Sequence, residues 1–183
     1  MAGGCVAYQG APGSFSHEAC AVLRPWDEAI GHDTFEAAIR SVLDGRCDCA
    51  LMPVENSQIG DVQPARGLVD ASGLVVLAEV WRPIRLALMG PPGARLSDVR
   101  TVESHPAALG QCADTLASLN LMAVEAFDTA GAARAVAEAC DPGRAALAPA
   151  GAAEIYGLSI LRNDMQDSAN NRTRFVLLGR EGA

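Results

Sequence analysis

Cys47-Asp48-Cys49-Ala50-Leu51-Met52-Pro53-Val54 is an apolar run that leads directly into the polar triplet Glu55-Asn56-Ser57. A run with so little alternation between apolar and polar residues is typical of a strand buried on both faces of a sheet. The stretch before it predicts a helix over residues 35–43, because Thr34 is a good N-cap and Gly45 a good stop signal. A buried strand next to an amphipathic helix favours an α/β fold.

The same alternation of short apolar runs and helical stretches continues along the chain. It predicts strands at 6–8, 47–54, 74–80, 84–89, 100–103, 121–127, 145–148, 158–161 and 175–178, and helices at 14–23, 35–43, 62–69, 106–119, 130–139 and 152–156. This order indicates helices that flank mostly parallel sheets. The adjacent strands around Trp81-Arg82-Pro83 suggest a crossing between two lobes, and the polar run 163–171 suggests the return. We expect lobe 1 at about 1–79 plus 168–183 and lobe 2 at about 80–167.

Composition excludes several classes of function. The 183 residues carry a net charge of −8, so nucleic acid and anionic membrane are not expected partners. All 14 basic residues are Arg, and without Lys neither Schiff-base or pyridoxal-phosphate chemistry nor a Walker-type phosphate loop is available. The chain has no secretory signal and no apolar run of membrane-span length, so we expect a cytoplasmic protein. The spacing of the six Cys does not favour a metal site.

Small polar residues follow several of the predicted strands, where ligands bind in sheets of this kind. They are uncharged for the most part, and no Cys–His or Ser–His–Asp arrangement is visible. This favours a site that holds an anion through amides and hydroxyls. The stretch Asn171-Arg172-Thr173-Arg174-Phe175 adds a hydroxyl between two cations at the entry to a strand. The stretches after the earlier strands are Gly13–Ser16, Glu55–Ser57, Ser104–His105 and Asp128–Thr129.

Five motifs in this order resemble the catalytic domain of the prephenate dehydratase family, over nearly the whole chain. Two positions depart from the family pattern: Ser14, where Thr is more common, and Ala107, which replaces Gln. The motifs are Tyr8–His17, Pro53-Val54-Glu55-Asn56-Ser57, Ser104-His105-Pro106-Ala107-Ala108-Leu109 with Gln111, Asp128-Thr129-Ala130, and Thr173-Arg174-Phe175.

The resemblance implies that residues 1–183 form a lyase domain that converts prephenate to phenylpyruvate, water and carbon dioxide in phenylalanine biosynthesis. It implies a two-lobed fold like that of type II periplasmic binding proteins, with the active site in the cleft, no cofactor, no metal and a homodimer. Many family members continue into a phenylalanine-binding ACT regulatory domain, to which nothing before Ala183 corresponds. We therefore expect no phenylalanine inhibition of this chain through a regulatory site, which steady-state kinetics can test.

Matched position by position, the resemblance gives Thr173 the role of the essential hydroxyl. It places four further catalytic candidates in the same cleft, namely Asn56, Gln111, Ser104 and Glu55. Substrate contacts are expected from Ser14, Phe15, Ser57, His105, Thr129, Arg174 and Phe175.

The residues themselves support some of these roles and leave alternatives open. A guanidinium can grip a carboxylate with two hydrogen bonds, so Arg85 and Arg174 are candidate anchors, or else partners in ordinary salt bridges. Ser104 and Gln111 are seven residues apart and would share a helix face. Glu55 is either an acid or a residue that orients its neighbours.

Two other functions are alternatives to the interpretation as a prephenate dehydratase. A non-enzymatic small-molecule binding module could have the same fold, since function depends on the site. An arogenate dehydratase would act on the amino analogue of prephenate, and the sequence shows no extra partner for that amino group.

Overall fold

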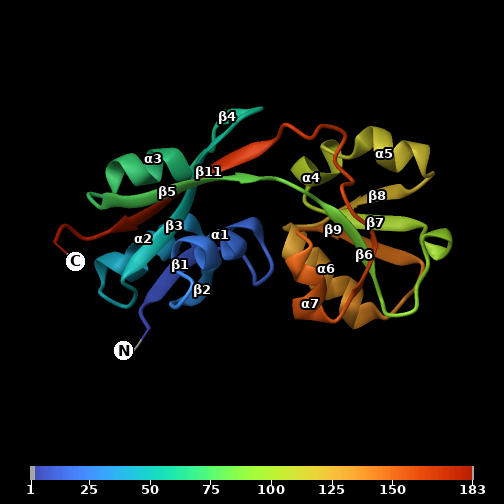
Figure 1. Cartoon of the computed structure of the whole chain (residues 1–183), viewed down its shortest axis with the longest axis horizontal. Coiled ribbons are helices and arrows are strands. Elements are labelled where there is room, and N and C mark those ends of the chain that lie inside the picture. Colours follow the sequence, from blue (N-terminus) through green and yellow to red (C-terminus); the bar gives the residue numbers. More distant parts are fainter. Residues whose placement is uncertain (1–2, 183) are drawn as a thin grey trace. The chain divides into compact units, whose positions relative to one another are not determined.

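The computed structural model describes residues 3–182, and the chain divides into two compact units. The first unit contains the N-terminal segment up to Ala11, residues 15–84 and the chain from Asn170 onward. The second contains residues 12–14 and 85–169. Each unit is an α/β layer structure (Figure 1), which confirms the predicted α/β class, but both sheets are mixed and not mostly parallel as expected.

The first unit is built on a mixed sheet with the strand order β2-β1-β3-β11-β5, and β4 pairs with β3. Strand β1 is parallel to β2 and β3, whereas β11 is antiparallel to both β3 and β5 (Figure 1). The sheet is mixed because β11 comes from the far end of the chain and not from a strand–helix–strand crossover. The strands are Cys5–Gln9 (β1), Glu28–His32 (β2), Cys49–Asn56 (β3), Gly60–Asp61 (β4), Val75–Pro83 (β5) and Arg172–Gly179 (β11).

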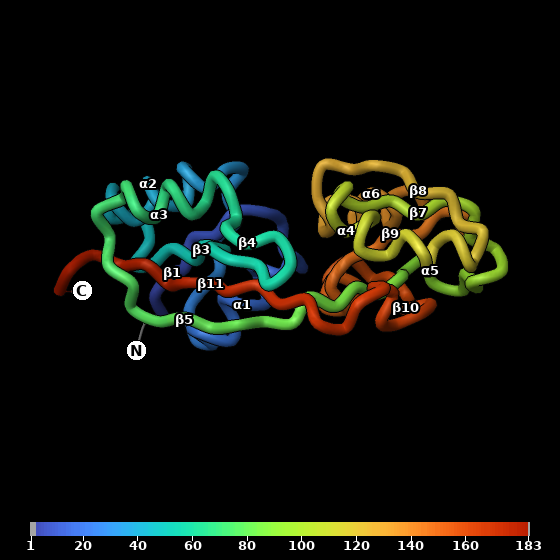
Figure 2. Tube along the Cα trace, turned by 90° about the horizontal axis from the view of Figure 1, so that it is seen from above, coloured from blue at the N-terminus to red at the C-terminus, as the bar shows by residue number. Residues whose placement is uncertain are grey.

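Three helices cover the two faces of this sheet, on opposite sides of the strands (Figure 2). One face packs on α1 (Phe15–Leu23) through Tyr8, Leu51 and Phe175. The other face packs on α2 (Phe35–Leu43) and α3 (Ala65–Ala71). The buried run that opens β3 contributes to both clusters, as expected for a central strand.

The second unit has a second mixed sheet, in the order β10-β6-β9-β7-β8. Alanine side chains from α6 and α7 cover one face, and small residues allow close packing of helix on strand. The strands are Ala87–Gly90 (β6), Thr101–Ser104 (β7), Met122–Glu125 (β8), Arg144–Ala148 (β9) and Ser159–Arg162 (β10). The helices are the 3-10 turn Leu96–Asp98, Pro106–Gly110 (α4), Ala113–Ser118 (α5), Thr129–Ala139 (α6) and Gly151–Tyr156 (α7).

Several predicted elements differ from the structure. Strand β2 was not predicted, because Glu28 and Gly31 interrupt its short apolar pattern. Strand β5 includes Trp81-Arg82-Pro83, and Pro83 is tolerated because it ends an edge strand. The helix expected over 106–119 is two helices, α4 and α5, with Gln111 as the C-cap of the first.

Within residues 3–182, no helix combines the length and the apolarity that a bilayer span requires. The expected cytoplasmic location therefore stays a prediction.

Candidate active site

Three buried polar side chains meet where β3 ends and β11 begins. Asn56 and Thr173 are each 7% exposed, and Asn171 is 2% exposed. Thr173 pairs directly with Asn56 across the two strands, and Asn171 precedes Thr173 by two residues. Directly paired residues project to the same face, which for Asn56 and Thr173 is the face covered by α1, and the side chain of Asn171, just before β11, meets them through its hydrogen bond to Asn56.

A β-bulge brings Asn56 to this face. Arg174 pairs with Glu55 but Phe175 pairs with Pro53, so Val54 has no direct partner in β11. The extra residue reverses the alternation of the last part of β3. Without it, Glu55 would share the face of Thr173 and Asn56 would point to the other side.

Backbone hydrogen bonds fix the orientation of the Asn56 amide. The N–H groups of Gln58 and Ile59 both donate to Asn56 Oδ1, at 2.9 and 3.3 Å. The other end of the amide must therefore be Nδ2, which donates to Asn171 Oδ1 at 2.7 Å and to Thr173 Oγ1 at 2.9 Å. Both amide hydrogens of Asn56 are used in this way.

This network leaves two donors with no partner among the described residues. Thr173 Oγ1 accepts the bond from Asn56, so its own proton remains to be donated. Asn171 uses its oxygen, and its buried Nδ2 has no hydrogen-bond partner. Buried donors of this kind ordinarily find a partner, so the two groups are suited to an oxygen-bearing ligand.

Ser57 holds the start of β11 in place. Its hydroxyl donates to the Asn170 carbonyl at 3.1 Å and accepts from the Arg172 N–H at 2.9 Å. Its backbone N–H donates to the Arg172 carbonyl, also at 2.9 Å. These bonds brace Asn171 from both sides, so the structure gives Ser57 a positioning role and does not support the expected substrate contact.

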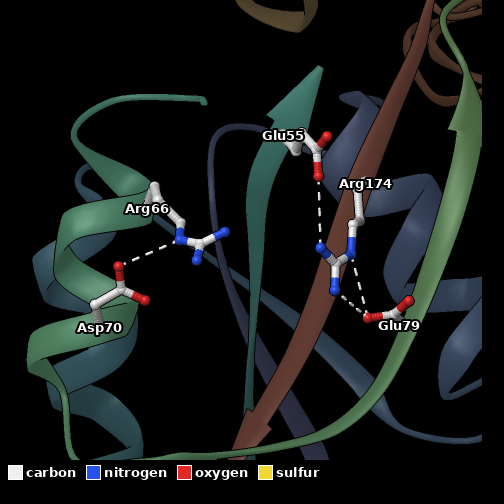
Figure 3. Close-up of polar contacts among 5 residues, drawn as sticks. All are labelled: Glu55, Arg66, Asp70, Glu79 and Arg174. Carbon is white, nitrogen blue, oxygen red and sulfur yellow. Dashed lines mark hydrogen bonds and ion pairs between the residues drawn. The ribbon is translucent and has the colours of Figure 1, made fainter. Parts of the chain in front are cut away.

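Glu55 and Arg174 lie on the opposite face of the sheet, with Glu79 of β5 (Figure 3). Arg174 donates to Glu79 Oε2 at 2.5 and 3.2 Å and to Glu55 Oε2 at 3.5 Å. The side-chain hydrogen bond with Glu79 raises the pKa of Arg174. The two carboxylates occupy the guanidinium, which speaks against Arg174 as a substrate anchor and against Glu55 as a catalytic acid.

Arg174→Gln is expected to lower the urea midpoint of unfolding while the KM for the substrate stays within about threefold of wild type. The reason is that the variant breaks a surface ion pair and leaves the face of Thr173 unchanged. Urea titration and steady-state kinetics on the same preparation check both parts. A rise in KM of tenfold or more would instead indicate that Arg174 binds a carboxylate of the substrate.

The expected aromatic contacts belong to the core. Phe175 is 2% exposed and packs with Tyr8 and Leu51 under α1. Phe15, the first residue of α1, is partly buried against the same cluster. Both side chains belong to the hydrophobic cluster between the sheet and α1.

In the second unit, Ser104 and Gln111 do not share a helix face, because Ser104 is the last residue of β7. Ser104 is fully buried, and its hydroxyl donates to the Leu147 carbonyl of β9 at 2.6 Å. That proton is therefore not available to a ligand, and the structure does not support a catalytic role. Gln111 caps the end of α4 and is half-buried, and its carbonyl accepts from the Asp167 N–H at 2.8 Å.

The remaining predicted residues of the second unit are tied to local structure. His105 caps α4, since its Nδ1 accepts from the Ala107 N–H at 3.1 Å. Thr129 opens α6 behind its N-cap Asp128, and Ser14 lies in the turn before α1. Arg85 forms an exposed ion pair with Asp164 at 3.5 Å.

Asp167 is a structural carboxylate at the start of α5. It accepts from the Asp114 and Thr115 N–H groups and from the Thr115 hydroxyl, at 3.0, 2.9 and 2.8 Å. Burial alone would raise the pKa of Asp167, but these hydrogen bonds together lower it. A lowered pKa means that Asp167 stabilises the fold above its unfolded value of about 3.9, and that this stabilisation is lost as the pH falls through the folded value.

Asp167→Asn is expected to destabilise the chain more at about pH 7 than at about pH 3, because the contribution of Asp167 in wild type is lost as the pH falls through its lowered folded pKa. Urea midpoints of wild type and variant at the two pH values measure this gap. Asp164→Asn is the matched control, since its exposed ion pair contributes little. An equal gap for Asp167→Asn at both pH values contradicts the assignment.

Two residues of this arrangement were not singled out from the sequence. Asn171 entered only as part of the stretch Asn171–Phe175, and Asp167 was not named. Asn171 could have been found from its spacing, because a residue two before Thr173 shares its face if the extended backbone continues past the start of β11 at Arg172.

The two-sheet α/β fold of this chain is also that of enzymes whose structures have been solved. Two solved structures are similar over 98% of this chain: GqqA, described as a novel type of quorum quenching acylase (TM-score 0.90, 38% identity, 65% of that chain), and prephenate dehydratase from Arthrobacter aurescens in complex with L-Phe (TM-score 0.88, 30% identity, 61% of that chain). Lipoprotein Tp32 from Treponema pallidum, at TM-score 0.50 and 15% identity over 98% of this chain and 84% of that chain, shares the fold alone.

The family model for prephenate dehydratase matches residues 6–183. The chain belongs to the prephenate dehydratase family. A relative from Komagataeibacter europaeus, named bifunctional N-acyl-homoserine lactone acylase/prephenate dehydratase, is 38% identical over 97% of this chain, and arogenate dehydratase 3 from Arabidopsis thaliana is 44% identical over 96%. The chain spans 63% and 42% of the lengths of these two relatives.

Proposed function

We propose that this chain catalyses the conversion of prephenate and one proton to phenylpyruvate, water and carbon dioxide. The proposal is supported by membership of the family and by one observation in the site. The amide of Asn56 is oriented so that Thr173 accepts a hydrogen bond and keeps its own proton for another acceptor. A departing hydroxyl group is such an acceptor.

The reaction needs no external oxidant or reductant. The bond from the ring to its hydroxyl breaks, and the oxygen leaves as water after protonation. The bond from the ring to its carboxylate also breaks, carbon dioxide departs, and the electron pair of that bond enters the ring. Formation of an aromatic ring supplies most of the driving force, so the protein has to bind the substrate, assist the departing oxygen and hold the remaining carboxylate.

In this proposal Thr173 donates a hydrogen bond to the departing oxygen. An alcohol hardly ionises near neutral pH, so the net proton comes from solvent while the hydroxyl stabilises the developing charge. A positioned donor of this kind contributes roughly 10²–10⁴ in rate. Asn56 donates to the Thr173 oxygen, so the Thr173 proton is directed away from Asn56.

Arogenate is the alternative substrate within the same proposal. Two relatives at 44% identity are named arogenate dehydratases, and a third at 44% is named arogenate dehydratase/prephenate dehydratase 6. The two substrates differ only by an amino group in place of the keto oxygen on the side chain. The residues around Thr173 act on the ring hydroxyl, which both substrates share.

A parallel assay tests the proposal. The chain is incubated with prephenate and with arogenate, and phenylpyruvate and phenylalanine are quantified against Thr173→Ala. We expect product from prephenate with wild type and a loss of roughly 10²-fold or more with the variant. Product from arogenate alone makes the chain an arogenate dehydratase, and product from neither substrate favours the binding-module alternative.

We also propose a cytoplasmic location and a homodimeric state for this chain. The cytoplasmic location is the expectation from the sequence and the homodimer is the expectation from the resemblance, whereas the relatives from Arabidopsis thaliana are named as chloroplastic proteins. Light scattering on the purified chain measures the oligomeric state, and a monomer at assay concentration contradicts the homodimer.

A further inference from the structure

Arg82 stands beside Thr173 in the sheet of the first unit. Thr173 of β11 pairs with Asn56 of β3 on one side and with Arg82 of β5 on the other. Neighbouring strands are about 4.8 Å apart, and directly paired residues project to one face. Asn56, Thr173 and Arg82 therefore form a single row across three strands, on the face covered by α1.

The contact of Arg82 with α1 agrees with this placement. Its Nη2 lies 3.9 Å from Glu18 Oε2, and its side chain is 34% exposed. A direct charge-assisted hydrogen bond is about 2.7–2.9 Å long, so this ion pair is loose. Among the described residues, Glu18 is the one partner that Arg82 has, and a guanidinium carries five N–H donors.

The other two Arg nearby belong to the opposite face. Arg174 is held by Glu55 and Glu79, and Arg172 lies over the Trp81 ring, 5.7 Å from its centroid. Arg82 is thus the guanidinium that shares the face of the Thr173 proton and of the unpartnered Asn171 Nδ2. These three groups are all donors, which suits a ligand whose oxygens carry negative charge.

We propose that Arg82 binds the carboxylate of the substrate that remains in the product. The proposal rests on the proposed function, which supplies a substrate with two carboxylates. The carboxylate that leaves loses its charge during the reaction, so a guanidinium bound to it would stabilise the ground state more than the transition state. The remaining carboxylate keeps its charge throughout, and binding it lowers the KM without slowing the chemical step.

The test compares Arg82→Gln with Arg172→Gln, the neighbouring Arg on the opposite face. We expect Arg82→Gln to raise the KM for prephenate about 10–100-fold with kcat within about threefold, because a charge-assisted hydrogen bond to the substrate is lost. Arg172→Gln keeps both constants within about threefold. Thermal midpoints confirm that each variant is folded, and Arg82→Lys, which keeps the charge but loses the planar fork, carries the same test if Arg82→Gln does not fold.

A binding measurement makes the outcome independent of turnover. Calorimetric titration with phenylpyruvate, and with benzyl methyl ketone as its analogue without the carboxylate, is run on all variants. We expect Arg82→Gln to weaken phenylpyruvate binding about tenfold or more and to leave ketone binding unchanged. Unchanged KM and unchanged phenylpyruvate affinity in Arg82→Gln, or no phenylpyruvate binding by wild type, overturns the assignment of Arg82. Arg82-dependent phenylpyruvate binding without turnover of prephenate supports it and refutes the proposed function instead.

Discussion

Thr173→Val is expected to lower kcat/KM for prephenate by roughly 10²–10⁴-fold, whereas Thr173→Ser stays within about tenfold of wild type. Val has the shape of Thr with a methyl group in place of the hydroxyl, so the variant removes the donated proton and the oxygen that accepts from Asn56, with little change in packing. Ser restores an oxygen at the same distance from the backbone. The pair of variants separates the hydroxyl from the packing of this buried position.

Stability measurements complete this prediction. In Thr173→Val the Asn56 Nδ2 loses one of its two acceptors, which costs about 1–3 kcal/mol for a buried group. Chemical denaturation measures this loss, and kinetics are read well below the midpoint. A Thr173→Val enzyme within a few-fold of wild type would leave Thr173 with a purely structural role.

The second large effect is expected from Asn56→Asp, which should give a folded but inactive protein. The carboxylate still accepts from the Gln58 and Ile59 N–H groups, as Asn56 Oδ1 does. Its second oxygen accepts where Asn56 Nδ2 donated, so the Thr173 hydroxyl and the Asn171 amide turn toward it. Both donors are then unavailable to the substrate, and kcat/KM falls by roughly 10²–10⁴.

Asn56→Ala is the control for this prediction. It removes the amide oxygen and the amide nitrogen of Asn56, so their buried hydrogen-bond partners are left unpaired. We expect a loss of about 1–3 kcal/mol of stability and a loss of activity. Near-wild-type turnover by a folded Asn56→Asp variant would show that the direction of the Thr173 proton does not matter.

The sequence allowed the α/β class and two residues of the network, Asn56 and Thr173, to be predicted. The apolar run 47–54 and the cap Thr34 follow from local physics, and Thr34 Oγ1 does accept from the Ala37 N–H. Asn56 and Thr173 came from motifs that the resemblance to the family identified, and the structure brings them into direct contact.

The face on which each residue lies could not be predicted. Simple alternation along β3 puts Glu55 with Leu51 on the face of Thr173, and only the unpaired Val54 reverses it. Such a bulge depends on how two strands 119 residues apart pair, which no local pattern encodes. For the same reason the sequence favoured Arg174 and Arg85 as anchors, while the pairing of β11 with β5 places Arg82 beside Thr173.

The role of the Thr173 proton is tested most directly by kcat/KM for prephenate in wild type, Asn56→Asp, Thr173→Val and the double variant. If Asn56 and Thr173 both act by directing the Thr173 proton to the substrate, kcat/KM falls by roughly 10²-fold or more in each single variant. The double variant then falls no more than about threefold below the worse single variant, because residues that act as a unit are not additive. No turnover by wild type, or losses of kcat/KM that multiply in the double variant, would contradict a shared role of Asn56 and Thr173 in catalysis.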